Sequence, residues 1–311
     1  MRIATLCTGV LVVLSAHAAR AQLTFTPGNF YSANDFSRTI TQYGPSGAIV
    51  GSITLPSTAA DEIRGLAFGP DGLLYATAQR GSGFAVLALD PTGTIRQTYA
   101  MDNVYVAGNI SYGKLAVDGR NIFVTGQNQL TRFNVGDPTS GTSVYTNNQM
   151  FDVEMLPTGN LLVASAYEVN EITRDGALVR GIVPSTQSFT DIRGIEYDPS
   201  TNKLFVTHLG HSDFFFKIMR LDATTGALEK TADFNYADDL FLTDSGNLLV
   251  GSRTQAPRLY TEDLNQIGTL AGTERIFVTE NVPEPTTIAA LGCIAVAALC
   301  RRRRTARATI A

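Results

Sequence analysis

The sequence has only three cysteines among 311 residues, and all of them lie near its ends, at Cys7, Cys293 and Cys300. The long segment between them therefore has no disulfide bonds and no thiol chemistry. The sequence also lacks a P-loop, a G-x-G-x-x-G after a strand, a CxxC pair and a G-x-S-x-G elbow. The common motifs for nucleotide binding, redox chemistry and serine hydrolysis are thus missing.

Basic residues are scarce in the body of the chain. Seven of the 24 lysines and arginines lie within the first 20 residues or after residue 300, which leaves 17 against 28 acidic residues and a net charge of −11. This balance argues against a nucleic-acid partner, because phosphate contacts need clustered lysine and arginine. Only 17% of residues are charged, whereas there are 28 glycines and 12 prolines, a composition typical of an all-β globular protein.

One pattern recurs along the chain: a short apolar run, a tight turn, and a second apolar run rich in Val, Leu, Phe or Tyr. The clearest copy is GLAFGPDGLLYAT at residues 65–77, where Pro70 and Gly72 suit a type I turn between two strands. The other copies occupy residues 114–125, 152–164, 194–207 and 239–251. Their second runs are spaced by 48, 39, 43 and 44 residues, which is the length of a four-stranded propeller blade.

A second turn motif sets the number of blades. It occurs as GPSG (44–47), DPTG (90–93), DPTSG (137–141), RDG (174–176) and DATTG (222–226). We expect these turns to join the third and fourth strands of each blade. The first of them has no complete repeat before it, so the lone strand at 275–280 is expected to complete the N-terminal blade and close the ring. The sequence therefore predicts an all-β, six-bladed β-propeller over residues 22–281, with blades at about 29–56 with 275–280, 61–100, 110–147, 150–184, 190–233 and 237–271.

Residues 1–21 are predicted to be a signal peptide. Arg2 provides a basic start, residues 3–16 are largely apolar, and Ala19-Arg20-Ala21 is a cleavage site before Gln22, with residues 16–18 as the alternative. An uncleaved anchor or a buried helix is the competing interpretation, which the shortness of the apolar run disfavours.

The C-terminal region combines a polar motif, an apolar segment and a basic run. The motif is Val282, Pro283, Glu284 and Pro285, and the basic run is Arg301, Arg302, Arg303 and Arg304. Residues 286–300 between them are predicted to form a transmembrane helix with the arginines in the cytoplasm. The alternative is a domain-terminal helix with a solvated basic end, although such a helix would show a polar face. A tail of seven residues, 305–311, follows.

This order of features over residues 282–304 resembles the PEP-CTERM sorting signal, apart from a slightly long tail. The resemblance implies a transient anchor in the inner membrane through residues 286–300 and cleavage by an exosortase near the motif. It further implies release to the cell surface or extracellular matrix of a Gram-negative, often polysaccharide-producing bacterium. The repeats are loosely similar to NHL, gluconolactonase-type and YVTN-type propellers, a likeness that concerns the fold alone.

Two repeats share an extension, DEIRGLAF (61–68) and TDIRGIEY (190–197), in the second and fifth predicted blades. These blades face each other across a six-bladed ring, so we expect the shared charges to approach one mouth of the channel. The candidate ligand or metal residues are Glu62, Arg64, Asp191 and Arg193, with Asp152, Asp238 and Asp239 near equivalent positions of the fourth and sixth blades. Such a mouth could bind Ca²⁺ through carboxylates or an acidic sugar through arginine. The alternative is that each arginine pairs with a neighbouring acid for structural reasons.

Two further groups have a functional and a structural interpretation. His208 and His211 with Asp213 resemble half of a zinc site, but no third histidine exists outside the leader, which favours a surface loop. Residues 214–216, three phenylalanines, could stack on a sugar, although blade strands are buried on both faces and core packing is favoured.

The favoured function is a secreted, surface-sorted binding or scaffold module in the extracellular or exopolysaccharide matrix, with an exosortase and then exopolysaccharide or surface proteins as partners. No catalytic set is recognisable. Glu62 and Asp191 could belong to a gluconolactonase-type metal site, but a full Glu, Asn and Asp set cannot be matched. A metal-dependent sugar lactonase or lyase and a purely structural surface protein are the alternatives. Convergent carboxylates at the mouth would favour the enzyme, and an exposed apolar patch would favour the scaffold.

Overall fold

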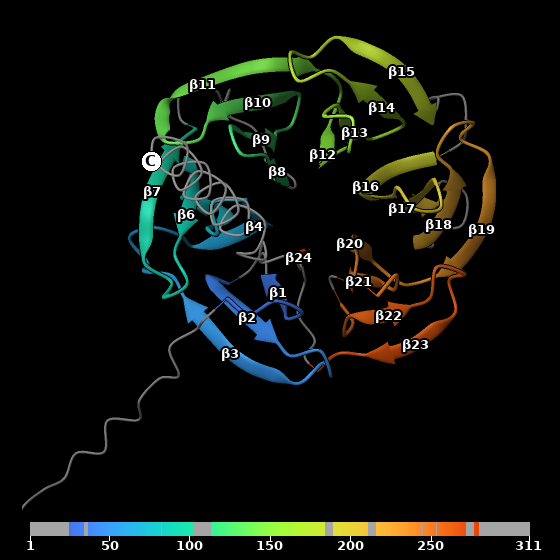
Figure 1. Ribbon diagram of the computed structural model, residues 1–311, viewed down its shortest axis with the longest axis horizontal. Coiled ribbons are helices and arrows are strands. Elements are labelled where there is room, and N and C mark those ends of the chain that lie inside the picture. The colour runs from blue at the N-terminus through green and yellow to red at the C-terminus, as the bar shows by residue number, and fades with distance from the viewer. Residues whose placement is uncertain are drawn as a thin grey trace, which may run out of the picture.

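The computed structural model describes residues 25–33, 37–81, 83–101, 113–183, 189–210, 216–243, 245–252, 254–271 and 277–279. These residues form 24 strands in six four-stranded antiparallel sheets, arranged around a central axis (Figure 1). The prediction of an all-β, six-bladed propeller is confirmed. The described residues contain no helix long and apolar enough to cross a membrane. The predicted signal peptide, sorting motif, apolar helix and tail lie outside the described residues.

Each blade runs from an innermost strand beside the axis to an outermost strand at the rim. Blade I consists of β24 (Phe277–Thr279), β1 (Phe30–Ala33), β2 (Thr39–Tyr43) and β3 (Ile49–Thr54). Blade II consists of β4 (Glu62–Phe68), β5 (Leu74–Arg80), β6 (Gly83–Leu89) and β7 (Ile95–Ala100). Blade III consists of β8 (Leu115–Val117), β9 (Asn121–Thr125), β10 (Gln129–Asn134) and β11 (Asp137–Thr146).

The second half of the ring repeats this arrangement. Blade IV consists of β12 (Met150–Met155), β13 (Leu161–Ser165), β14 (Val169–Ile172) and β15 (Leu178–Val183). Blade V consists of β16 (Phe189–Asp198), β17 (Lys203–Gly210), β18 (Phe216–Asp222) and β19 (Leu228–Asp233). Blade VI consists of β20 (Ala237–Leu242), β21 (Leu248–Ser252), β22 (Arg258–Tyr260) and β23 (Gln266–Thr269).

The two ends of the propeller meet in blade I. Strand β24 pairs with β1, with Thr279 opposite Tyr31 and Phe277 opposite Ala33. Blade I therefore contains strands from both ends of the domain, and the last strand provides the hydrogen-bond partner that the inner edge of β1 needs. This closure joins the first and last parts of the ring through backbone pairing.

The turns between third and fourth strands follow the predicted motifs in four of the five places where a motif was assigned. In blade II, Asp90 accepts backbone hydrogen bonds from Thr92 and Thr94 at 2.8 and 3.0 Å, which fixes the DPTG turn. The assignment of DPTSG in blade III is wrong. That segment lies inside β11, and the turn before it is made at Val135 and Gly136. Gly136 has φ +85°, so the chain reverses there.

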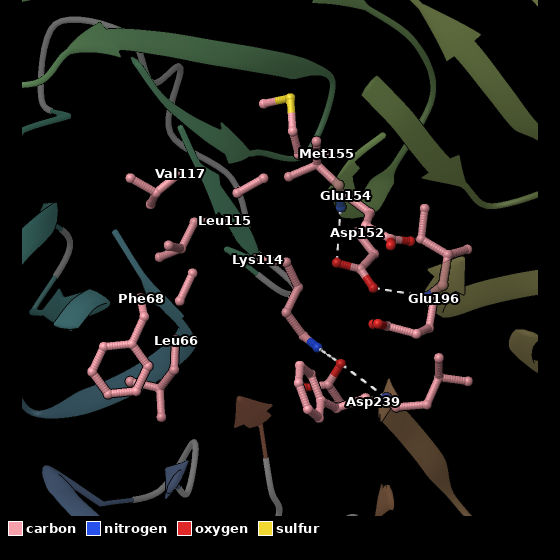
Figure 2. Close-up of a pocket in the computed structure, with 16 residues that line it drawn as sticks. Leu66, Phe68, Lys114, Leu115, Val117, Asp152, Glu154, Met155, Glu196 and Asp239 are labelled. Carbon is pink, nitrogen blue, oxygen red and sulfur yellow. Dashed lines mark hydrogen bonds and ion pairs between the residues drawn. The ribbon is translucent and has the colours of Figure 1, made fainter. Parts of the chain in front are cut away.

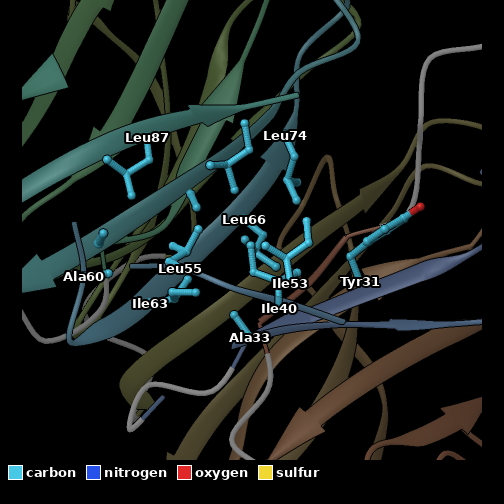
Figure 3. Packing of buried hydrophobic residues seen from close by; sticks show 13 residues of the cluster. Tyr31, Ala33, Ile40, Ile53, Leu55, Ala60, Ile63, Leu66, Leu74 and Leu87 are labelled. Atoms are coloured by element: carbon cyan, nitrogen blue, oxygen red, sulfur yellow. The ribbon is translucent and has the colours of Figure 1, made fainter. Parts of the chain in front are cut away.

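The hydrophobic core is divided among the interfaces between neighbouring blades. Between blades I and II, for example, Ile40 and Tyr31 lie in one cluster with Leu66, Leu74 and Leu87 (Figure 3). Comparable clusters lie between each of the other neighbouring pairs. Burying one Leu or Ile side chain stabilises the fold by about 1.5–3 kcal/mol. Each blade is therefore held mainly by its neighbours, and the innermost strands are fixed around the channel.

Candidate functional site in the central channel

A cavity of about 250 Å³ lies in the central channel (Figure 2). It is lined by β4, β8, β12, β16 and β20, the innermost strands of blades II to VI. Its charged side chains are Lys114, Asp152, Glu154, Glu196 and Asp239. The volume is slightly below the range of roughly 300–1,000 Å³ found for small-molecule pockets, so the cavity suits a small ligand.

The repeat brings these charged side chains together. Asp152 and Asp239 occupy the same repeat position, opposite Ala164 and Gly251 of the second strands. Two residues further along the innermost strands, Glu154 and Glu196 again share one position, in blades IV and V. Because side chains alternate along a strand with a period of two, positions two residues apart lie on the same side. The carboxyl groups therefore form two successive layers in the channel.

In the first layer, Lys114 and Asp239 form an ion pair. Lys114 immediately precedes β8 in blade III and Asp239 lies in β20 of blade VI, so the pair spans the channel between opposite blades (Figure 2). Both residues are buried, with exposed fractions of 4% and 5%. A backbone hydrogen bond of 3.0 Å from Leu240 N–H to Asp239 Oδ1 also holds this carboxylate.

Asp152 is the other carboxyl of the first layer, and both of its oxygens accept hydrogen bonds. Val153 N–H donates to Oδ1 at 2.8 Å, and Ile195 N–H of the next blade donates to Oδ2 at 2.8 Å. Burial raises the pKa of Asp152 to about 7, the nearby Lys114 ammonium opposes that rise, and the Asp239 carboxylate adds to it. Asp152 is thus close to its titration point at neutral pH.

The second layer is a pair of glutamates with raised pKa values. Burial raises the pKa of Glu154 well above its usual range, and the neighbouring Glu196 carboxyl raises it further. Burial likewise raises the pKa of Glu196 well above its usual range, with Asp152 and Asp239 contributing. Each glutamate accepts one backbone hydrogen bond from the next blade, at Tyr197 and Leu242 respectively. The raised pKa values favour the protonated forms of the pair, and a nearby cation would oppose this shift.

Access to the cavity varies along the strands. The first layer is buried, whereas Glu154 and Glu196 are partly exposed. Phe68 and Met155, at the ends of β4 and β12, are partly exposed as well. The accessible part of the lining therefore lies toward the turns that join first and second strands.

In blade II the structure places the predicted residues in a local ion pair. Arg64 pairs with Glu62 of the same strand and donates a 3.1 Å hydrogen bond to Gln79 of β5. A β-bulge lies at Arg64, between Ile63 and Gly65. Bulges redirect side chains, and Arg64 is not among the residues that line the cavity.

In blade V the corresponding arginine reaches the next blade. Arg193 binds Asp238 of β20 at 2.8 Å and Asp191 of its own strand at 3.6 Å. Arg193 and Asp238 are buried, with exposed fractions of 8% and 3%. Of the channel-mouth candidates, the structure brings Asp152 and Asp239 to the cavity and places the others in ion pairs at the starts of β4, β16 and β20.

The glycine of the shared Ile-Arg-Gly motif has a packing role. A β-carbon built on Gly65 would lie 2.6 Å from the carbonyl oxygen of Gly113 in blade III. On Gly194 it would lie 3.2 Å from the carbonyl oxygen of Asp238 in blade VI. The motif thus marks two places where the innermost strand closely approaches the next blade, and this contact accounts for the glycine that blades II and V share.

The described residues cover the expected metal site only in part. No group of three or more His, Cys, Asp or Glu among them could hold a metal ion. His208 is buried in β17, and its predicted partners His211 and Asp213 lie outside the described residues. Phe216 is buried in β18 with the Arg193 guanidinium 5.3 Å from its ring centre, while residues 214 and 215 are likewise not described.

Sequence reasoning missed Lys114, Glu154 and Glu196. A signal for the two glutamates was available, because they interrupt apolar runs at one repeat position, as DVEML and GIEYD. The other blades carry Ala67, Ala116 and Phe241 at this position. Burying a charged side chain in a strand costs free energy unless the charge is neutralised or paired. Such an interruption of an apolar run is therefore a sequence signal for a site.

The chain matches no known protein-family model and no curated protein. It is similar to a chain of the nidogen/laminin complex, with a TM-score of 0.64 at 16% identity over 81% of this chain and 97% of that chain. A protein of unknown function from Bacteroides caccae gives 0.56 at 13% identity, covering 81% and 98% of the two chains. A functionally unknown protein from Desulfotomaculum acetoxidans gives 0.57 at 12% identity, covering 83% and 100%. At these identities the likeness shows a shared six-bladed β-propeller fold.

Proposed function

We propose that this chain is a binding or scaffold propeller that is exported, anchored transiently in the inner membrane, and sorted to the cell surface. There it binds exopolysaccharide or surface proteins of the extracellular matrix. The observation that carries the proposal is a set of exposed aliphatic side chains on the outermost strands. Ile49, Leu178, Leu228 and Ile267 have exposed fractions of 56%, 61%, 51% and 52%.

The position of these side chains favours contact with a large partner. They lie on β3, β15, β19 and β23, which form the rim of blades I, IV, V and VI (Figure 1). An outermost strand also offers backbone N–H and C=O groups that a partner strand can pair with. A partner that pairs with such an edge would also cover the apolar side chains on it, which favours its binding there.

Two other observations support the proposal. The resemblance of residues 282–304 to a sorting signal supports surface delivery. The similar chain from the nidogen/laminin complex belongs to an assembly of two proteins, which is consistent with a binding role for this propeller. Five of the charged residues predicted at the mouth pair with one another, which favours a structural role for them: Glu62, Arg64, Asp191, Arg193 and Asp238.

The proposal is tested by fractionating a polysaccharide-producing bacterium that expresses the full chain. We expect the protein in the surface and matrix fractions, and we expect a Pro283→Ala/Pro285→Ala variant to accumulate in the inner membrane. A variant with serine at Ile49, Leu178, Leu228 and Ile267 is expected to reach the surface but to leave the matrix on washing. The matched control is Thr98→Ala/Thr231→Ala, which changes exposed polar residues on outermost strands. Equal retention of all variants would contradict binding through the rim.

A further inference from the structure

We propose that the channel cavity binds a small organic cation, a primary amine with an apolar body, whose ammonium group lies between Glu154 and Glu196. This inference goes beyond binding at the rim and does not depend on it. It rests on the hydrogen-bonding capacity of the cavity, on its charge balance and on the separation of its apolar and acidic sides.

The hydrogen-bonding capacity is concentrated on the two glutamates. Both oxygens of Asp152 already accept backbone N–H groups, and Asp239 accepts from Leu240 N–H and pairs with Lys114. By contrast, Oε2 of Glu154 is buried and has no hydrogen-bond partner among the described residues. A buried acceptor without a partner is costly, so a donor placed beside it stabilises the complex.

The charge balance of the cavity favours a cation. Four carboxyl groups face it and Lys114 is its single basic side chain within the described lining. The part of β4 in the lining, residues 66–68, carries no titratable group. Other titratable groups on β12, β16 and the strands packed against them do not line it: Asp191, Arg193, Tyr197, Asp198, Lys203, His208 and Asp238. Four carboxyl groups against one ammonium leave an acidic excess of up to three charges, of which a bound monovalent cation offsets one.

Burial raises the pKa of both glutamates, which favours a proton on the pair when no cation is bound. An ammonium group between the two carboxyls would displace such a proton, because it favours their ionised forms. Amine binding should therefore release protons and should strengthen as pH rises toward the pKa of the empty site. The amine itself stays charged in this range.

The opposite side of the cavity is apolar. Leu66 and Phe68 of blade II lie across the channel from Glu196 of blade V, and Leu115 and Val117 of blade III lie beside them (Figure 2). A ligand with its ammonium at the glutamates can therefore place a ring or short alkyl chain against these side chains. Metal binding is disfavoured, because no group of carboxylates among the described residues is arranged for it.

The experiment is a calorimetric titration of the full chain with phenethylamine, with phenethyl alcohol as the neutral control ligand of similar size. Titrations at pH 6 and pH 8, each in two buffers with different ionisation enthalpies, measure the protons released. We expect the amine to bind with proton release, and its affinity to rise by up to about tenfold per pH unit for each proton displaced. We expect the alcohol to bind at least about tenfold more weakly at pH 8. Equal affinities of amine and alcohol, or amine binding without proton release, would overturn the proposal.

Substitutions locate the site. Glu154→Gln and Glu196→Gln keep the size of the side chain and should each lower amine affinity by about tenfold or more at pH 8. The control Glu62→Gln changes a glutamate that pairs with Arg64 outside the cavity and should bind the amine normally. Unchanged affinity in both channel variants would refute the site. If a channel variant fails to fold, the proton-release measurement on the unsubstituted chain still tests the proposal. The serine variant of the rim should bind the amine normally, so failure at the channel and failure at the rim can be distinguished.

Discussion

Lys114 and Asp239 connect opposite blades of the ring through an ion pair that is buried in the channel. Neighbouring blades are held by apolar clusters, whereas this contact crosses the axis from blade III to blade VI. The pair also sets the electrostatic environment of Asp152, because the lysine lowers and the aspartate raises the pKa of that carboxyl. The charged groups of the first layer, which come from three blades, therefore influence one another's ionisation.

Removal of the lysine should destabilise the fold strongly. Lys114→Met leaves Asp239 buried without its cation, and loss of one partner of a buried pair costs about 3–5 kcal/mol. The free energy of unfolding, measured with urea at pH 8, should fall by this amount. The loss should be smaller at pH 5.5, because Asp152 then carries a proton and less negative charge remains.

The double variant Lys114→Met/Asp239→Leu provides the control. It removes both charges and fills their place with apolar atoms, so it should recover most of the stability. If the single and double variants were equally unstable, lost packing would explain the effect and the ion pair would contribute little.

The stability of the propeller should decrease as pH rises from 5.5 to 8. The folded-state pKa values of Asp152, Glu154 and Glu196 are raised, so the folded state binds more protons than the unfolded state above about pH 4. This contribution is fully present below the unfolded pKa and is lost as pH rises through the folded pKa. Each carboxyl gives a slope of up to about −1.4 kcal/mol per pH unit.

Urea unfolding across this range checks the slope, with Glu154→Gln/Glu196→Gln as the comparison. The double variant cannot ionise at these positions, so its profile should be flatter and it should be more stable than the unsubstituted chain at pH 8. Carboxyls with lowered pKa values, such as Asp90 and Asp198, lose their contribution only at lower pH and do not affect this window. Parallel profiles for the two proteins would contradict the raised glutamate pKa values.

The blade count was predictable because each repeat carries its own local signals. Leu74, Leu161 and Leu248, which aligned the repeats, begin β5, β13 and β21. The misassigned turn in blade III shows the limit of such signals. Its Asp-Pro-Thr-Ser-Gly segment at 137–141 matches the turn chemistry, yet the reversal occurs just before it, at Val135 and Gly136. Two local sequences there are compatible with a turn, and strand pairing selects one of them.

The site was less predictable, since bulges and inter-blade contacts decide where the charges point. The bulge at Arg64 and Arg193 recurs at the equivalent position of blades IV and VI, but the partner that each arginine binds depends on the neighbouring strands and blades. Lys114 binds a residue 125 positions away, as a consequence of ring closure. Glu154 and Glu196 could have been predicted from the sequence, because the same repeat position is apolar in the blades that carry Ala67, Ala116 and Phe241.

Adding a methyl group at Gly65 should destabilise the interface between blades II and III. The β-carbon of Gly65→Ala would lie 2.6 Å from the Gly113 carbonyl oxygen and 3.0 Å from Lys114 Cα, so the backbone must shift. Overpacking of this kind costs about 1–3 kcal/mol. The control Gly268→Ala has its nearest contact at 3.7 Å and should change stability little. Thermal denaturation of both variants measures the difference, and equal melting temperatures would argue against close approach as the reason for the motif.

The two arginines of the repeated motif should differ in their contributions to stability. Arg193 binds the buried Asp238 of the next blade at 2.8 Å, so Arg193→Ala removes one partner of a buried ion pair and should cost about 3–5 kcal/mol. Arg64 pairs with the more exposed Glu62 in its own blade, and Arg64→Ala should cost about 1 kcal/mol or less. Urea unfolding of the two variants at pH 7 gives the comparison. If both losses were small and equal, Arg193 would not link blades V and VI, and a ligand-binding role for the two arginines at the mouth would become the better explanation of their repetition.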